Sequence, residues 1–81
     1  MSVPVLFFAS YADLFGSRRL MVPLEPPCTI AEIVQALRLF PGGERLPGRP
    51  LVAVNQVWML DQQAVVQPDD EVAIIPPVAG G

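Results

Sequence analysis

The residues best suited to chemistry in this chain of 81 are its last two, Gly80 and Gly81. A terminal α-carboxylate has a pKa of about 3.5, so it is an ionised nucleophile at neutral pH. Its attack on the α-phosphate of ATP would form an acyl-adenylate. That adenylate could accept sulfur to give a thiocarboxylate, or a lysine to give an isopeptide. Since glycines lack Cβ atoms, they can enter a narrow channel. We therefore expect Gly81 to react inside the active site of another protein.

The segment before the glycines should hold them away from the domain. Proline cannot continue a sheet and favours extended polyproline geometry. We therefore expect a domain over residues 1–75 and an extended tail over residues 76–81. The tail residues that place Gly81 would be Pro76, Pro77, Val78, Ala79 and Gly80.

The residue inventory excludes most other catalytic sites. The chain has no His and no Lys, which excludes Ser-His-Asp and Cys-His arrangements, a Schiff base and a P-loop. A single Cys without His provides no zinc site. Cys28 is expected to be a packed or idle thiol, and Asp69-Asp70-Glu71 a solvated turn, although a nucleophile and a cation site are their alternatives. We expect no metal and no permanently bound cofactor, with ATP used only by an activating enzyme.

Charge and composition limit the kind of partner. The net charge is −3 and the five Arg are scattered, which argues against nucleic-acid binding. We expect no signal peptide, because the first ten residues lack a positively charged region and their apolar run is short. No apolar run comes near the roughly 20 residues that span a membrane. With its single cysteine, a reducing cytoplasm is the expected location. Its 52% hydrophobic content predicts an exposed apolar patch for a partner, unless the strands are buried on both faces.

The first third of the chain predicts two strands joined by a helical turn. Residues 3–9 are β-branched and aromatic, and Pro4 fits an edge strand or the first residues of a strand. Ser10 can cap a turn over residues 10–16, with Asp13 three residues on and Gly16 ending it. Residues 20–24 predict the second strand.

The clearest helix begins at Thr29. Thr29 and Glu32 have capping-box spacing. Apolar residues follow at helical spacing, and residues 41–43 (Pro-Gly-Gly) should end the helix. The residues of this apolar face are Ile30, Ile33, Val34, Leu37 and, at its end, Phe40.

The remaining residues predict more strands. Residues 51–54 and 57–59 flank a turn at Asn55-Gln56, and a turn at 67–70 precedes a strand over 71–75. Two early strands, a crossing helix and later strands predict an α+β fold, with a mixed sheet packed on one main helix.

Four segments together resemble the small subunit of molybdopterin synthase, a sulfur carrier of the ubiquitin-like β-grasp fold. The resemblance covers essentially the whole chain, and its ending is the most specific part. The segments are LFFA at 6–9, the helix pattern from Thr29 to Leu37, VAVNQ at 52–56 and DEVAIIPPVAGG at 70–81.

The resemblance implies a mechanism and a set of partners. An E1-like adenylyltransferase would adenylate Gly81 with ATP, and a sulfur donor protein would convert it to a thiocarboxylate. The tail would then insert into the large subunit of a heterotetramer and donate sulfur to a cyclic pyranopterin precursor. The carrier would thus be non-catalytic alone but the sulfur-donating subunit of a sulfurtransferase.

The resemblance also implies a partner surface. Because side chains alternate along a strand, Leu6 and Phe8 share one face, as do Ala73 and Ile75. By resemblance, Phe8, Trp58 and Ile75 would contact the large subunit; the alternative is that Phe8 and Trp58 are core residues. The chain departs from the family near its end: Asp69 stands where the family has a turn glycine, and Ile74-Ile75 stand where it has a pair of aromatic residues. The family often has Arg-Glu where this chain has Ala12-Asp13, so a charged contact is either missing or supplied elsewhere.

Two alternatives remain: one keeps the chemistry of the terminus but changes the acceptor, and the other assigns the terminus no chemistry. A related carrier would use the same terminus for tRNA thiolation, thiamine or cysteine synthesis, or conjugation to lysines. Having no Lys, the chain could not form lysine-linked chains on itself. A plain interaction module with an inert tail would be indifferent to loss of Gly80-Gly81.

Overall fold

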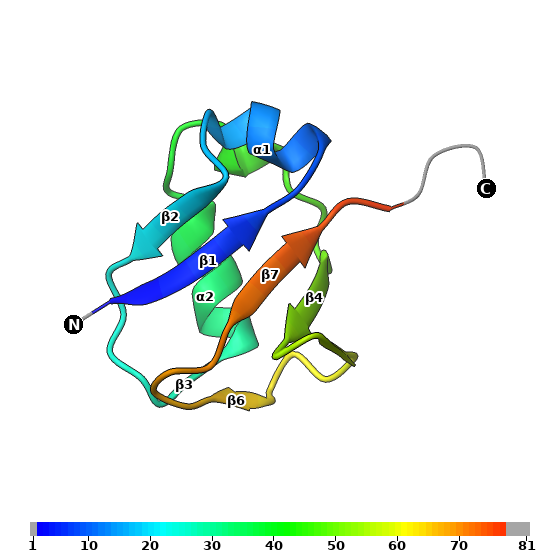
Figure 1. The fold of residues 1–81 in the computed structure, drawn as a ribbon. Helices are drawn as coiled ribbons and strands as arrows, with labels where there is room; N and C mark the ends of the chain where they lie inside the picture. Colours follow the sequence, from blue (N-terminus) through cyan, green and yellow to red (C-terminus); the bar gives the residue numbers. More distant parts are fainter. Residues whose placement is uncertain (1, 78–81) are drawn as a thin grey trace.

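A computed structural model describes residues 2–77, in which a five-stranded mixed sheet packs on one main helix (Figure 1). The order across the sheet is β2-β1-β7-β4-β5. β7 lies at its centre, parallel to β1 and antiparallel to β4. The predicted α+β class is confirmed. The strands are β1 (Val3–Phe7), β2 (Arg19–Val22), β4 (Leu51–Val54), β5 (Val57–Met59) and β7 (Val72–Ile75).

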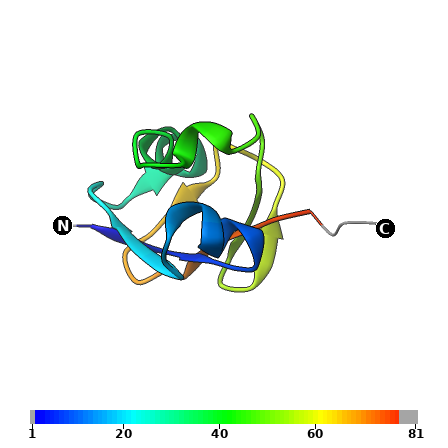
Figure 2. The same ribbon diagram turned by 90° about the horizontal axis from the view of Figure 1, so that it is seen from above.

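The main helix, α2 (Ile30–Leu37), covers one face of this sheet (Figure 2). The Glu32 amide donates to Thr29 Oγ1 at 3.1 Å, and the Thr29 amide donates to Glu32 Oε1 at 2.9 Å. This is the predicted capping box, which satisfies two amides that the helix leaves free. The buried face of α2 is the predicted one: Ile30, Ile33, Val34 and Leu37.

Strand alternation separates a core face from a face that we call the open face, the one opposite α2. Val5 and Phe7 of β1 and Val72 and Ile74 of β7 are buried. Phe8 is exposed and Leu6 partly so, as the alternation predicts. The sequence offered two settings for Pro4, an edge strand or the first residues of a strand. β1 is an interior strand and Pro4 is its second residue, so the second setting is the correct one.

The short helix α1 (Ser10–Phe15) corrects one prediction. Its N-cap is Ala9, with no side-chain hydrogen bond, so the predicted Ser10 cap is wrong. Ala9 turns the chain with φ 50° and ψ −125°, and its carbonyl accepts from the amides of Ala12 and Asp13. This turn places Ser10 inside the helix. Gly16 ends α1 in the left-handed region at φ 70°, as predicted.

The main helix ends earlier than predicted, at Leu37. Gly42 and Gly43 do not end the helix; they lie in close contact with the backbone of Leu14 and Leu37. Gly42 has φ 88°, and a Cβ there would come within 2.5 Å of the Leu14 carbonyl oxygen. A Cβ on Gly43 would overlap the Leu37 carbonyl oxygen. These two glycines therefore let the chain pass close to α1 and to the end of α2.

Three short elements were not predicted. β3 (Cys28–Thr29) and β6 (Val65–Val66) pair antiparallel as a separate two-stranded sheet, and η1 (Gly43–Arg45) is a single 3₁₀ turn. Two or three residues are too few to show a periodicity.

Candidate functional site

The tail leaves from the central strand. Ile75 ends β7, paired with Leu51, and Pro76 and Pro77 follow outside any strand. Pro77 is exposed. The other predicted tail residues lie outside the described residues: Val78, Ala79, Gly80 and Gly81.

The strand register brings Phe8 to the place where the tail starts. β1 and β7 are parallel, with Phe7 opposite Ile74, so their carboxyl ends lie at the same end of the sheet (Figure 1). Phe8 follows β1 directly, as Ile75 follows Ile74 in β7. Two of the predicted partner residues are thus neighbours at the root of the tail.

The open face carries a continuous apolar row across the sheet. Leu6 pairs with Ala73, Ala73 with Ala53, and Ala53 with Trp58. Phe8 is 48% exposed and Trp58 56% exposed, so neither is a core residue, whereas Ile75 is partly buried. All three predicted partner residues lie on this face, although Trp58 lies on the edge strand, two strands from Ile75.

Sequence reasoning missed members of this face that the alternation could have revealed. Leu51 is 41% exposed and pairs with Ile75. Since Val52 and Val54 of β4 point to the core, Leu51 and Ala53 point to the open face. Leu51 therefore links the Phe8–Ile75 end of the face to Trp58.

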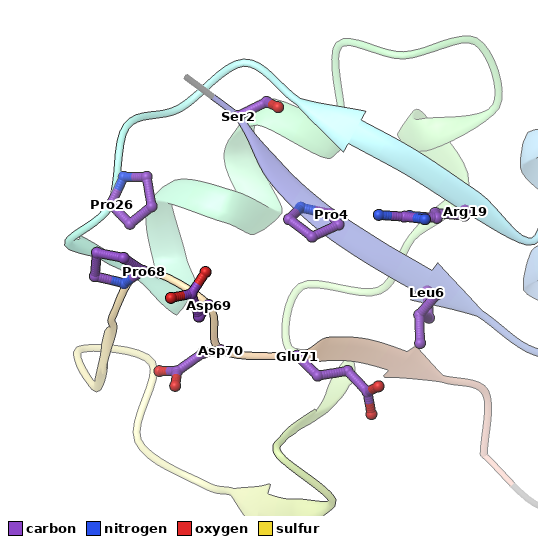
Figure 3. A pocket seen from close by; sticks show the side chains of 9 residues that line it. All are labelled: Ser2, Pro4, Leu6, Arg19, Pro26, Pro68, Asp69, Asp70 and Glu71. Atoms are coloured by element: carbon purple, nitrogen blue, oxygen red, sulfur yellow. The ribbon is translucent and has the colours of Figure 1, made fainter.

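A hollow on the open face lies at the opposite end of the sheet from the tail (Figure 3). Pro4 and Leu6 of β1 line it, with Arg19 on one side. The carboxylates of residues 69–71 lie on the other side. Because these residues surround the beginnings of β1 and β7, the hollow lies away from Pro76 and Pro77, which follow the end of β7.

Asp70 has a structural role at the base of β7. Its Oδ2 accepts from the Gln67 amide at 2.8 Å and its Oδ1 from Asn55 Nδ2 at 2.9 Å. These bonds, the Gln67 one first, hold the pKa of Asp70 below its ordinary value. The Glu71 amide donates to Asn55 Oδ1 at 2.9 Å. This network confirms the predicted turn, in which Asp69 has φ 72°.

Two chemical alternatives lose support. The Cys28 thiol is buried, and burial first, then the nearby Glu32 carboxylate, raises its pKa. It is therefore a neutral, packed thiol at neutral pH, as expected. Within residues 2–77, no group of three or more His, Cys, Asp or Glu could hold a metal ion. No helix in that range is long and apolar enough to cross a membrane.

Comparisons with known proteins match nearly the whole chain. The ThiS family model covers residues 5–81. The molybdopterin synthase sulfur carrier subunit of Homo sapiens is 37% identical over 90 residues, covering 98% of this chain and 93% of the relative.

Solved structures show the same fold. SAMP1, a small archaeal modifier protein from Haloferax volcanii, has a TM-score of 0.82 at 27% identity, with 100% of both chains covered. A complex of subunits 1 and 2 of the molybdopterin-converting factor from Helicobacter pylori contains a chain with a TM-score of 0.72 at 21% identity, again with both chains fully covered. The ubiquitin-like β-grasp prediction is confirmed.

Proposed function

The chain belongs to the ThiS family, and on that basis we propose that it is the sulfur-carrier small subunit of a molybdopterin synthase. The observation that carries this proposal is the 37% identity to the human sulfur carrier subunit over almost the full length of both chains. The ending Asp70-Glu71-Val72 through Gly80-Gly81, recognised in the sequence alone, supports it.

The reactive group in this proposal is the Gly81 carboxylate. Its oxygen attacks the α-phosphorus of ATP and pyrophosphate leaves, which gives an acyl-adenylate. A sulfide equivalent then attacks the carbonyl carbon and displaces AMP, leaving a thiocarboxylate. The carrier supplies no acid, base or cofactor to these steps, and ATP belongs to the activating enzyme. The E1-like adenylyltransferase and the sulfur donor protein are therefore required partners.

The acceptor in the proposal is a cyclic pyranopterin precursor held by the large subunit. Pro76, Pro77, Val78, Ala79 and Gly80 would place the Gly81 thiocarboxylate against it. Water then attacks the Gly81 carbonyl carbon and breaks its bond to the transferred sulfur, so the sulfur stays on the precursor, Gly81 is a carboxylate again and the carrier can be reloaded. A heterotetramer of two small and two large subunits is the proposed assembly.

The open face is the proposed contact surface for the large subunit. Phe8, Leu51 and Trp58 together expose large apolar side chains on it, and patches of this kind mark partner sites. The tail leaves from the centre of the same sheet. A partner that covers the open face near Phe8 and Ile75 would therefore meet the root of the tail.

The first test is the intact mass of the protein isolated from its native cells together with its noncovalent partners. We expect the mass of the chain with one terminal oxygen replaced by sulfur, and a copurified partner that converts the pyranopterin precursor. An unmodified terminus in every preparation, including those from cells that are actively making molybdopterin, would contradict the proposal.

A second candidate differs only in the acceptor. The similarity to SAMP1 favours it, because that protein is named as a modifier. Gly81 would then form an isopeptide with a lysine of another protein, or deliver sulfur to another pathway. The same mass measurement separates the candidates: a covalent adduct to another protein, or sulfur without the pyranopterin-converting partner, selects the second.

A further inference from the structure

A second hollow lies at the tail end of the sheet and differs from the one in Figure 3. Its apolar lining consists of Leu6, Phe7, Phe8, Ala9 and Ala12. Arg18 is the one charged residue that lines it. Leu6 and Phe8 also belong to the open face, so the hollow is continuous with the proposed contact surface.

A backbone hydrogen bond holds residue 18 in place, while the side chain of Arg18 is exposed and can contact a partner. Its carbonyl accepts from the Phe7 amide at 2.9 Å, which ties residue 18 to the end of β1. Its side chain is exposed, and within residues 2–77 its guanidinium has no hydrogen bond or ion pair. The guanidinium of Arg38, in contrast, donates to the Leu46 and Pro47 carbonyls.

The chemistry of the hollow favours one carboxylate. A guanidinium binds a carboxylate through two parallel hydrogen bonds, and apolar walls strengthen such bonds once a partner excludes water. A phosphate monoester would bring up to about two negative charges against one cation. The chain itself carries a net charge of −3, so an acidic partner side chain would be attracted here only by a local cation.

We propose that Arg18 is a specificity-determining residue that pairs with one Asp or Glu side chain of the large subunit, inserted into the hollow beside Phe8. This proposal rests on the proposed function and deepens it. Phe8 supplies apolar contact area and Arg18 fixes which partner surface fits, because an unpaired charge at a closed interface is costly.

The test uses the full chain and the large subunit from the same organism, with affinity measured by calorimetry. Arg18→Glu should weaken binding by roughly 30-fold or more, as expected for the loss of a desolvated charge pair. The affinity of Arg18→Lys should lie between those of the wild type and Arg18→Glu, because lysine keeps the positive charge but lacks the planar guanidinium that forms two parallel hydrogen bonds. Arg45→Glu is the matched control, since Arg45 is exposed on η1 and its substitution changes the net charge by the same amount.

A charge-reversal screen identifies the partner residue. Each Asp and Glu on the large subunit's carrier-binding surface is changed to Arg, and one change should restore affinity for Arg18→Glu. Equal affinities of Arg18→Glu and Arg45→Glu, or no restoring change, would overturn the Arg18 proposal while wild-type binding leaves the function standing. A wild-type carrier that does not bind the large subunit would overturn both.

Discussion

At the scale of single residues, Asp70 and Asn55 join two turns that are far apart in the sequence. Asn55 lies in the left-handed region at φ 53°, in the turn between β4 and β5. Its side chain bonds to both Asp70 and the Glu71 amide. The VAVNQ segment is therefore a structural signature, which sets the position of the turn that leads into β7.

The lowered pKa of Asp70 predicts an acid-dependent loss of stability. A carboxyl group whose folded pKa is depressed stabilises the fold above its unfolded pKa, and this contribution is lost as pH falls through the folded pKa. Asp70→Asn should lower the melting temperature at pH 7, because Gln67 and Asn55 donate to different oxygens of Asp70 and an amide has an NH₂ donor in place of one of them. The difference from wild type should shrink as pH falls below the ordinary Asp value of 3.8.

Thermal melts at pH 7 and at pH 2 to 3 check this, with Asp13→Asn as the control for removing one exposed charge. A melting-temperature difference for Asp70→Asn that stays constant across this range would show that the ionised carboxylate is not the stabilising form.

At the scale of elements, the sequence predicts those that have a strong local signal. The capping box and the period of α2 were predicted because Thr29, Glu32 and four apolar residues all agree. The turn at Asn55-Gln56 was predicted in the same way. Ser10 was misassigned as a cap because Ala9 adopts a backbone conformation that its residue type does not indicate. β3 and β6 depend on a pairing across the chain, which no local pattern reveals.

Gly43 gives a prediction about the junction between α2 and η1. Gly43→Ala should destabilise the fold by about 3 kcal/mol or more, because the added methyl group overlaps the Leu37 carbonyl. Gly48→Ala is the matched control: its Cβ would meet nothing within 4 Å, and it should change stability by no more than about 1 kcal/mol. Urea denaturation of both variants makes the measurement. Similar free energies of unfolding for the two would show that the junction relaxes.

At the scale of the whole molecule, the sheet has a core face and the open face, which is the proposed contact surface. Alternation predicted the face of Phe8 and Ile75 correctly. The row from Leu6 to Trp58, and the role of Leu51 within it, required the strand order and register, which depend on contacts between distant residues. Arg18 was seen only as one of five scattered arginines, because its hollow is formed by β1 and α1 together.

Phe8→Ala tests this division. It should weaken affinity for the large subunit by roughly tenfold or more while leaving the melting temperature nearly unchanged, since Phe8 is half exposed. Leu39→Ala is a control from the region after α2, 87% exposed and off the open face. Calorimetric titration and thermal melts give the two readouts. A large loss of melting temperature with affinity preserved would make Phe8 a core residue.

The parallel pairing of β1 with β7 has a mechanical consequence. A partner that grips the tail while the domain is drawn away pulls Ile75 along the axis of β7. Val5–Val72, Leu6–Ala73 and Phe7–Ile74 lie side by side along that axis, so the β1–β7 hydrogen bonds are loaded together in shear. The neighbouring strand β4 shares the load from the other side. Such a sheet resists tension that would unzip a hairpin one bond at a time, so a pull on Pro76 along β7 would leave the fold intact.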